Sequence, residues 1–359
     1  MSKILKRSSR ENMLTYAMVI FSFIGMELLI GTGSVNSVLQ GQLVPICAYA
    51  VMAVSLNLTV GVLGELSLGH AGFMSIGAFS GVVASFALEQ IVPWGPLRLA
   101  LAMGVGAACA AVAGVLIGIP VLRLAGDYLA IVTLAFGEII KNLITCLYVG
   151  IDERGLHVSF LGSASDLHLR EGGRVIVNGP MGISGIQKLS SFPAGFVLLL
   201  VALFVLLNLI NSRAGRAIMA LRDNQIAAES VGIPVTKYKM MAFVTSAALA
   251  GAAGALYAMN YSTVVASKFN FNTSILILVF VVLGGLGKMW GSIIAAVVLT
   301  VLPEMLRGFN DYRMLIYAIV LILVMLATNN QNMKELFGRV RAGVAGAVKN
   351  PGREGEPNE

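Results

Sequence analysis

The sequence predicts an all-α polytopic membrane protein with about ten transmembrane helices, some of them broken or re-entrant. Three observations predict this class: 57% of the 359 residues are hydrophobic, only 12% are charged, and 40 are glycine. A soluble domain carries about 25% charged residues, so this composition cannot supply a water-facing surface. It excludes a soluble enzyme, a disordered chain and a nucleic-acid-binding domain. The net charge of +7 is therefore attributed to basic loops on one membrane face.

The apolar runs of the chain predict ten membrane spans, because a helix needs about 20 apolar residues to cross about 30 Å of hydrocarbon. The eighth and ninth spans form one long run that is interrupted only by the glycine-rich segment 284–288. They are either two short or tilted spans or a re-entrant pair. The expected spans are residues 13–30, 40–62, 66–88, 98–120, 127–149, 193–210, 240–260, 273–287, 290–306 and 313–328.

The distribution of basic residues predicts which loops face the cytoplasm. Lys and Arg are concentrated in the N-terminal segment 1–12, in the loop 211–239 and in the C-terminal tail 329–359. Ten spans place these three segments on one side, so both termini are expected in the cytoplasm. Residues 13–328 then form the transmembrane domain.

The loop 150–192 falls on the outer side and carries four basic and four acidic residues. Its length exceeds that of most structureless connections, so we expect it to carry structure of its own. Residues 174–177 read Arg-Val-Ile-Val and precede Asn-Gly-Pro, which predicts a short strand followed by a turn. We hypothesise that this loop shapes the outer mouth of the protein.

A short helix is expected within the cytoplasmic loop 211–239. Asp223 or Asn224 can cap its N-terminus, and Gly232 fits the position just after its end. The helix either docks another protein through a small apolar face or rests on the headgroups of membrane lipid. That face is formed by Ala227, Ala228 and Val231.

The same segment resembles the coupling loop of ABC importer permeases, whose consensus begins E-A-A-x-x-x-G. Ile226-Ala-Ala-x-x-x-Gly232 fits this consensus, with Ile226 in place of the Glu, whereas the downstream I-x-L-P part is absent. The longer stretch 222–232 is similar to one branch, the branched-chain amino acid permeases.

Further motifs of that branch occur along the chain in matching order. Residues 64–78 resemble its S-L-G-H-A-x-F motif, and residues 126–138 resemble its fifth-span signature. Residues 178–186 resemble its outer-loop G-x-x-G-I element, and residues 281–287, followed by Gly291, resemble its late glycine-rich break. The resemblance therefore covers most of the chain and is closest to the M-type permease subunit.

The resemblance implies an assembly in the bacterial inner membrane. An H-type permease would form the other half of the pore, two cytosolic ATPases would drive it, and a periplasmic binding protein would deliver leucine, isoleucine or valine. The chain lacks the G-x-x-x-x-G-K-[ST] phosphate-binding motif, so we expect a transport subunit that is not an enzyme and needs no cofactor or metal. The residues that match the coupling motif, and are implied to contact an ATPase, are Asp223, Ile226, Ala227, Ala228, Glu229 and Gly232.

Ionisable side chains within spans are candidate functional groups because charge is costly in the membrane. Glu138 and Lys141 are three residues apart and can pair on one helix face, as a structural contact or as part of a gate or cargo site. Glu65 and His70 flank a glycine-rich break, where His70 either bonds a freed backbone carbonyl or takes part in transport. The candidate pore or gate residues are Glu65, His70, Glu138, Lys141, Gly284, Gly285 and Gly287.

The sequence also allows one alternative function: an ion- or proton-coupled secondary transporter of small apolar amino acids that uses Glu138 and Glu65 as relays. An intramembrane enzyme is disfavoured, because the sequence holds no H-E-x-x-H, no G-x-S-x-G and no paired intramembrane aspartates. The preferred amino acid, and whether the permease core is a homodimer or a heterodimer, are both left open.

Overall fold

The computed structural model describes residues 2–32, 37–124, 126–152, 155–160, 167 and 173–306, together with five positions between 315 and 322. The chain divides into two units, Met1–Val301 and Leu302–Glu359. The tenth expected span, 313–328, lies largely outside the described residues, and the tail 329–359 lies wholly outside them.

Helices account for most of the described chain and follow the expected spans in order. Seven helical segments of the described residues are long and apolar enough to cross a membrane, and the apolar helices Thr15–Gly31 and Met289–Met305 are shorter. The chain is thus a multi-pass membrane protein, although the expected ten spans are not reached within the described residues. The helices are α1 (Ser2–Gly31), α2 (Ser37–Asn57), α3 (His70–Ala87), α4 (Gly95–Val121), α5 (Asp127–Thr145), α6 (Phe192–Asn211), α9 (Val235–Ala258), α10 (Phe271–Gly284) and α11 (Met289–Met305).

The prediction of an all-α protein is wrong in the outer loop, which forms a small antiparallel sheet. The strand order is β2-β1-β3-β4-β5, and Val149 pairs with Val158 on one side and with Val177 on the other. The strand and turn predicted from residue 174 onward are confirmed. The strands are β1 (Leu147–Asp152), β2 (Gly155–Phe160), β3 (Arg174–Asn178), β4 (Ile183–Ser184) and β5 (Thr263–Val264).

The fifth span ends earlier than expected because of this sheet. Helix α5 stops at Thr145, and residues 147–149 belong to β1 rather than to the helix. Tyr148, Val149 and Ile151 are of the aromatic and β-branched types that favour strands, and β1 pairs with neighbours on both sides. The expected span is too long because the apolar run continues into a segment that forms a strand.

The helices pack closely through small residues, most clearly among α3, α4 and α9. A Cβ atom at Gly77 of α3 would collide with the backbone of Gly251 in α9. A Cβ atom at Gly114 of α4 would lie 2.9 Å from the Cβ atom of the buried Ala247. Small residues of this kind let helix backbones approach within a membrane, where the hydrophobic effect adds little to helix association.

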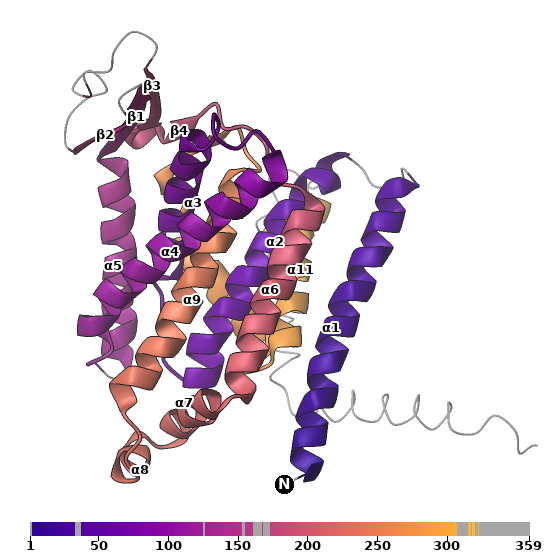
Figure 1. Cartoon of the computed structure of the whole chain (residues 1–359). Helices are drawn as coiled ribbons and strands as arrows, with labels where there is room; N and C mark the ends of the chain where they lie inside the picture. Colours follow the sequence, from indigo (N-terminus) through magenta and orange to yellow (C-terminus); the bar gives the residue numbers. More distant parts are fainter. Residues whose placement is uncertain are drawn as a thin grey trace, which may run out of the picture. The chain divides into compact units, whose positions relative to one another are not determined.

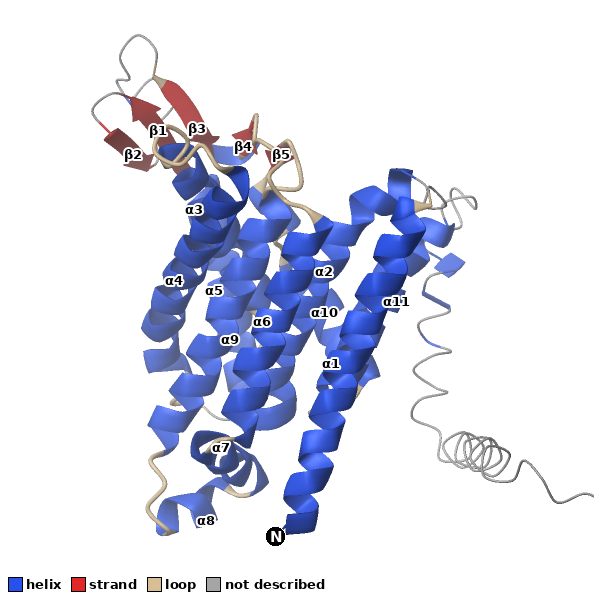
Figure 2. Ribbon diagram, turned by 45° about the vertical axis from the view of Figure 1, so that its right-hand side comes forward, coloured by secondary structure: helices blue, strands red, loops and turns tan. Residues whose placement is uncertain are grey.

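The sheet and the helices of the loop 211–239 lie at opposite ends of the helices (Figure 1). Helices α7 (Arg213–Asp223) and α8 (Gln225–Ser230) lie at the same end as the N-terminus of α1. Figure 2 shows β5, which follows α9, beside β4 at the sheet end. The segments 1–12 and 211–239 therefore share one end, and the loop 150–192 lies at the other, as the charge distribution predicts.

Candidate functional site

Helix α8 forms where the sequence predicts it and is capped at both ends. Asn224 is the N-cap: its Oδ1 accepts a hydrogen bond from Ala227 N at 3.0 Å. At the other end, Gly232 has a φ of +84°, its N donates to Glu229 O at 2.9 Å, and Ile233 N donates to Ala228 O at 3.1 Å. This pair of bonds is the Schellman arrangement, which needs a residue in the left-handed conformation and so favours glycine.

The exposed face of α8 differs from the expected one. Ala228 is only 5% exposed, so the prediction that it shares an exposed face with Ala227 is wrong. Ala228 instead faces the rest of the chain, where its small side chain allows α8 to lie close to α7 and α9. Ile226 and Val231 are 80% and 75% exposed, which places two large apolar side chains in solvent at the end of the protein.

Helix α7 connects α8 to the membrane helices through Arg222. Helix α2 continues into a six-residue π-helix, η1 (Leu58–Leu63), and Arg222 Nη1 donates to Gly61 O in η1 at 3.1 Å. The stem of Arg222 lies against Gly64, which has a φ of +83° and leaves no room for a Cβ atom. Asp223, which ends α7, accepts a hydrogen bond from Arg222 Nη2 at 3.1 Å.

The two glycine-rich breaks of the chain are in contact with each other. Gly285 and Gly287 have φ values of +94° and +79°, which confirms the break between α10 and α11. A Cβ atom at Gly61 would collide with Gly287 N, and one at Gly284 would collide with the backbone of Gly291. We call the contact among η1, the 285–288 break and Arg222 of α7 the glycine junction.

Asn57, the last residue of α2, holds this junction and was missed by sequence reasoning. Its Oδ1 accepts a hydrogen bond from Gly287 N at 2.8 Å, and its Nδ2 donates to Ser292 Oγ at 2.8 Å. The available signal was an amide side chain within the apolar run 40–62, where an unpaired polar group would be costly.

Glu65 and His70 have fixed partners within the chain. Glu65 forms an ion pair with Lys239 of α9, and the two side chains are 15% and 5% exposed. His70 is buried, and its Nε2 lies 2.8 Å from Ser55 Oγ of α2. The structure thus places Glu65 beside the start of α9, close in the chain to the glycine junction, and His70 at the start of α3.

Glu138 and Lys141 form the predicted ion pair on α5, away from Glu65. Glu138 Oε1 also accepts a hydrogen bond from Phe271 N at 3.2 Å, so the carboxylate meets the N-terminus of α10. The start of α3 lies nearby, because Ala71 N donates to Ser274 Oγ in the first turn of α10 at 3.1 Å. The side chains of Glu138 and Lys141 are 33% and 22% exposed.

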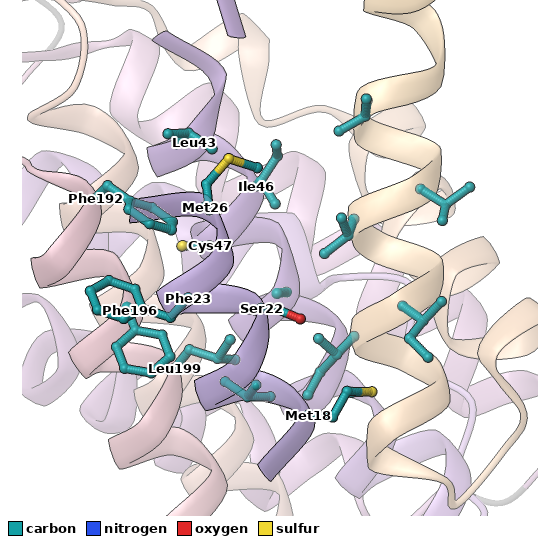
Figure 3. Close-up of a pocket in the computed structure, with 17 residues that line it drawn as sticks. Met18, Ser22, Phe23, Met26, Leu43, Ile46, Cys47, Phe192, Phe196 and Leu199 are labelled. Atoms are coloured by element: carbon teal, nitrogen blue, oxygen red, sulfur yellow. The ribbon is translucent and has the colours of Figure 1, made fainter. Parts of the chain in front are cut away.

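A cavity of about 230 Å³ lies between α1, α2, α6 and α11, and none of the predicted site residues line it (Figure 3). Phe23 stacks on Phe196 there, with 4.0 Å between the ring centroids. The described lining residues include no Asp, Glu, Lys, Arg or His, so this cavity offers no charged group to a polar cargo.

Comparison with known proteins identifies relatives among transport permeases. High-affinity branched-chain amino acid transport system permease proteins LivM from Salmonella typhimurium and Escherichia coli are 38% and 37% identical, over 291 and 287 residues. Each alignment covers 77% of this chain, which spans 66% of the length of each relative. The nucleoside ABC transporter permease protein NupC from Lactococcus lactis is 26% identical over 211 residues, which are 55% of this chain and 60% of NupC.

No solved structure matches the chain significantly. The family described as "Branched-chain amino acid transport system / permease component" matches residues 38–325. These residues include α2 to α11, the sheet, α7 and α8, and the glycine junction. The chain therefore belongs to the family of branched-chain amino acid transport system permease components.

Proposed function

We propose that the chain is the membrane-spanning permease subunit of an ATP-driven ABC importer for leucine, isoleucine and valine. It forms half of the translocation pore in the bacterial inner membrane, and an H-type permease forms the other half. Family membership and the two LivM relatives support this assignment. The end that carries α7, α8 and the N-terminus of α1 faces the cytoplasm, as its basic residues indicate.

Helix α8 is the element that couples the permease to one of two cytosolic ATPases. The observation that carries this assignment is the exposure of Ile226 and Val231 on a capped helix outside the membrane helices. Large apolar side chains that stand in solvent outside the membrane helices suit a surface that another protein covers. Asp223, Ala227 and Glu229 belong to the same segment and contact the ATPase with it, while Ala228 and Gly232 shape the helix that presents it.

The α5 face with Glu138 and Lys141 lines the pore. Charged side chains at membrane depth face a protein interior or a water-filled path, and these two are partly exposed within this chain. A zwitterionic cargo suits a site that holds a carboxylate and an ammonium group together, and Glu138 contacts the start of α10. Gly284, Gly285 and Gly287 form the hinge of a gate at the inner end, near Glu65, and His70 holds the start of α3.

The sheet at the opposite end forms the periplasmic mouth where an amino-acid-binding protein docks. The strands β1 to β4, extended by β5 from the segment after α9, give the outer loop a defined surface rather than a structureless connection. The same binding protein sets the cargo preference, so the pore itself needs only weak contacts with the amino acid.

The test compares two charge substitutions on α8 with a neighbouring control. Ile226→Asp and Val231→Asp each place a charge at an exposed apolar position of this segment, so we expect normal membrane insertion, release of the ATPase during purification and loss of ATP-driven leucine uptake. Ser230→Ala removes a hydroxyl that bonds only its own helix, at Ala227 O, and should leave uptake unchanged.

Wild-type uptake and a bound ATPase in both charge variants would refute the coupling role of α8. Leucine uptake that persists in cells without the ATPase subunits would instead support the ion-coupled alternative, with Glu138 and Glu65 as relays. The structure does not favour that alternative, since each glutamate is paired with its own lysine in a separate polar cluster.

A further inference from the structure

The glycine junction joins two parts of the chain that are far apart in sequence. In η1, Arg222 Nη1 donates to Gly61 O at 3.1 Å, which ties α7 to the π-helix. The Gly287 backbone packs against the same residue, where no Cβ atom fits. Both contacts are therefore made by Gly61.

Asn57 bonds this turn to the α10–α11 break through its whole side chain. Its Oδ1 accepts from Gly287 N at 2.8 Å, and its Nδ2 donates to Lys288 O at 3.1 Å and to Ser292 Oγ at 2.8 Å. Asn57 and Ser292 are both fully buried. The backbone N–H and C=O partners fix the orientation of the amide, and only a side chain that both donates and accepts satisfies them.

The π-helix is the segment that would carry movement along this link. Single turns of π-helix occur mostly as interruptions of α-helices at functional sites. Here the turn replaces the end of α2, and the chain then leaves it through Gly64 in a left-handed conformation. A displacement of α7 would therefore act on a turn that directly follows Asn57, whose side chain holds the α10–α11 break by three hydrogen bonds.

We infer that Asn57 is a positioning residue that transmits movement of α7 and α8, through η1, to the break between α10 and α11. This inference rests on the proposed function, in which an ATPase moves α8, and adds the route by which that movement reaches the pore. Movement of α7 enters this route at Arg222 and reaches the break at Gly287, Lys288 and Ser292.

The experiment uses the complete transporter that purifies with this chain, reconstituted in liposomes, and measures leucine uptake per ATP hydrolysed. Asn57→Ala should keep the ATPase bound and active but lower this ratio about fivefold or more, the usual size of a coupling effect between sites. The matched control is Asn260→Ala, which removes the hydrogen bond that Asn260 Nδ2 donates to Gly41 O outside the junction and should leave the ratio unchanged.

A double variant distinguishes two substitutions that interrupt the same route from two substitutions that cause independent defects. If Arg222→Gln and Asn57→Ala interrupt the same link, the combined variant should be no worse than the poorer single variant. Multiplied losses in the double variant would overturn the inference. If Asn57→Ala does not assemble, Ser292→Ala replaces it, because this substitution removes one of the three hydrogen bonds of Asn57. A wild-type ratio of leucine uptake to ATP hydrolysis in Ser292→Ala would overturn the inference.

Spin labels at Arg216 and Leu286 provide a readout that does not depend on the cargo. In the wild type, we expect a narrow distribution of distances between the two labels that does not change when ATP binds. In Asn57→Ala, we expect this distribution to broaden. A wild type that shows no ATP-driven leucine uptake would refute the proposed function alone. An Asn57→Ala variant with a wild-type distance distribution would refute the link alone.

Discussion

Two ion pairs of identical chemistry occupy different surroundings in this protein. Glu65 and Lys239 join the loop after η1 to α9, with side chains 15% and 5% exposed. Glu138 and Lys141 lie on one turn of α5, with side chains 33% and 22% exposed. Residue type does not separate the two pairs, but sequence spacing and burial do, because Glu65 and Lys239 are 174 residues apart whereas Glu138 and Lys141 are three apart. The first pair joins distant parts of the chain and is shielded from solvent, and the second is local and partly exposed.

The neighbours of each pair strengthen this contrast. Glu65 follows Gly64, which is in a left-handed conformation and lies against the stem of Arg222 with no room for a Cβ atom. Glu138 accepts a hydrogen bond from Phe271 N at the start of α10, where the Thr273 and Ser274 amides bond to Asn270. The first region is closely packed, whereas the second is partly exposed.

The largest expected effect follows from breaking the buried pair. Lys239→Ala leaves Glu65 without its partner in a site shielded from water, and loss of one partner from a buried pair costs about 3–5 kcal/mol. We expect the melting temperature of the purified chain to fall substantially. Combining Lys239→Met with Glu65→Gln removes both charges and should recover most of that loss. A single variant as stable as the wild type would show that this pair does not hold the fold.

A smaller effect is expected from adding one methyl group to the glycine junction. In Gly61→Ala, the new Cβ atom would collide with Asn57 Oδ1 and Gly287 N, and overpacking of this kind costs about 1–3 kcal/mol. Gly104→Ala is the control, because no atom lies within 4 Å of a Cβ atom there. Thermal unfolding in detergent should separate the two variants, and equal stability would mean that the junction yields more easily than its geometry indicates.

The sequence predicted the features that depend on local interactions. Each of the first nine expected spans overlaps a described helix, because apolar length alone identifies a span. The C-terminal cap of α8 was predicted at Gly232, and the N-cap was narrowed to Asp223 or Asn224, of which Asn224 is the cap, because both caps depend on bonds to nearby residues. The pairing of Glu138 with Lys141 was predicted for the same reason.

Features that depend on distant contacts were not predicted. Ala228 is buried because α8 folds back on the chain, and its own helix gives no sign of this. Asn57 and Gly287 are separated by 230 residues, so no local pattern connects them. The sequence identified both glycine-rich breaks, but their mutual contact follows from helix packing that no periodicity encodes.

The last prediction concerns the accessible pair and has the smallest effect on stability. Lys141→Met removes the cation from a partly exposed pair, and such pairs contribute about 0–1 kcal/mol because solvent screens them. Glu138 keeps its hydrogen bond from Phe271 N, so α10 should start at the same residue. We therefore expect a nearly unchanged melting temperature together with reduced leucine uptake at unchanged ATP hydrolysis. Lys141→Arg keeps the charge and should retain uptake, since a cation is still available beside the N-terminus of α10. If Lys141→Met instead destabilised the protein as much as Lys239→Ala, both pairs would be structural, and accessibility would not distinguish a pore-facing charge from a buried one.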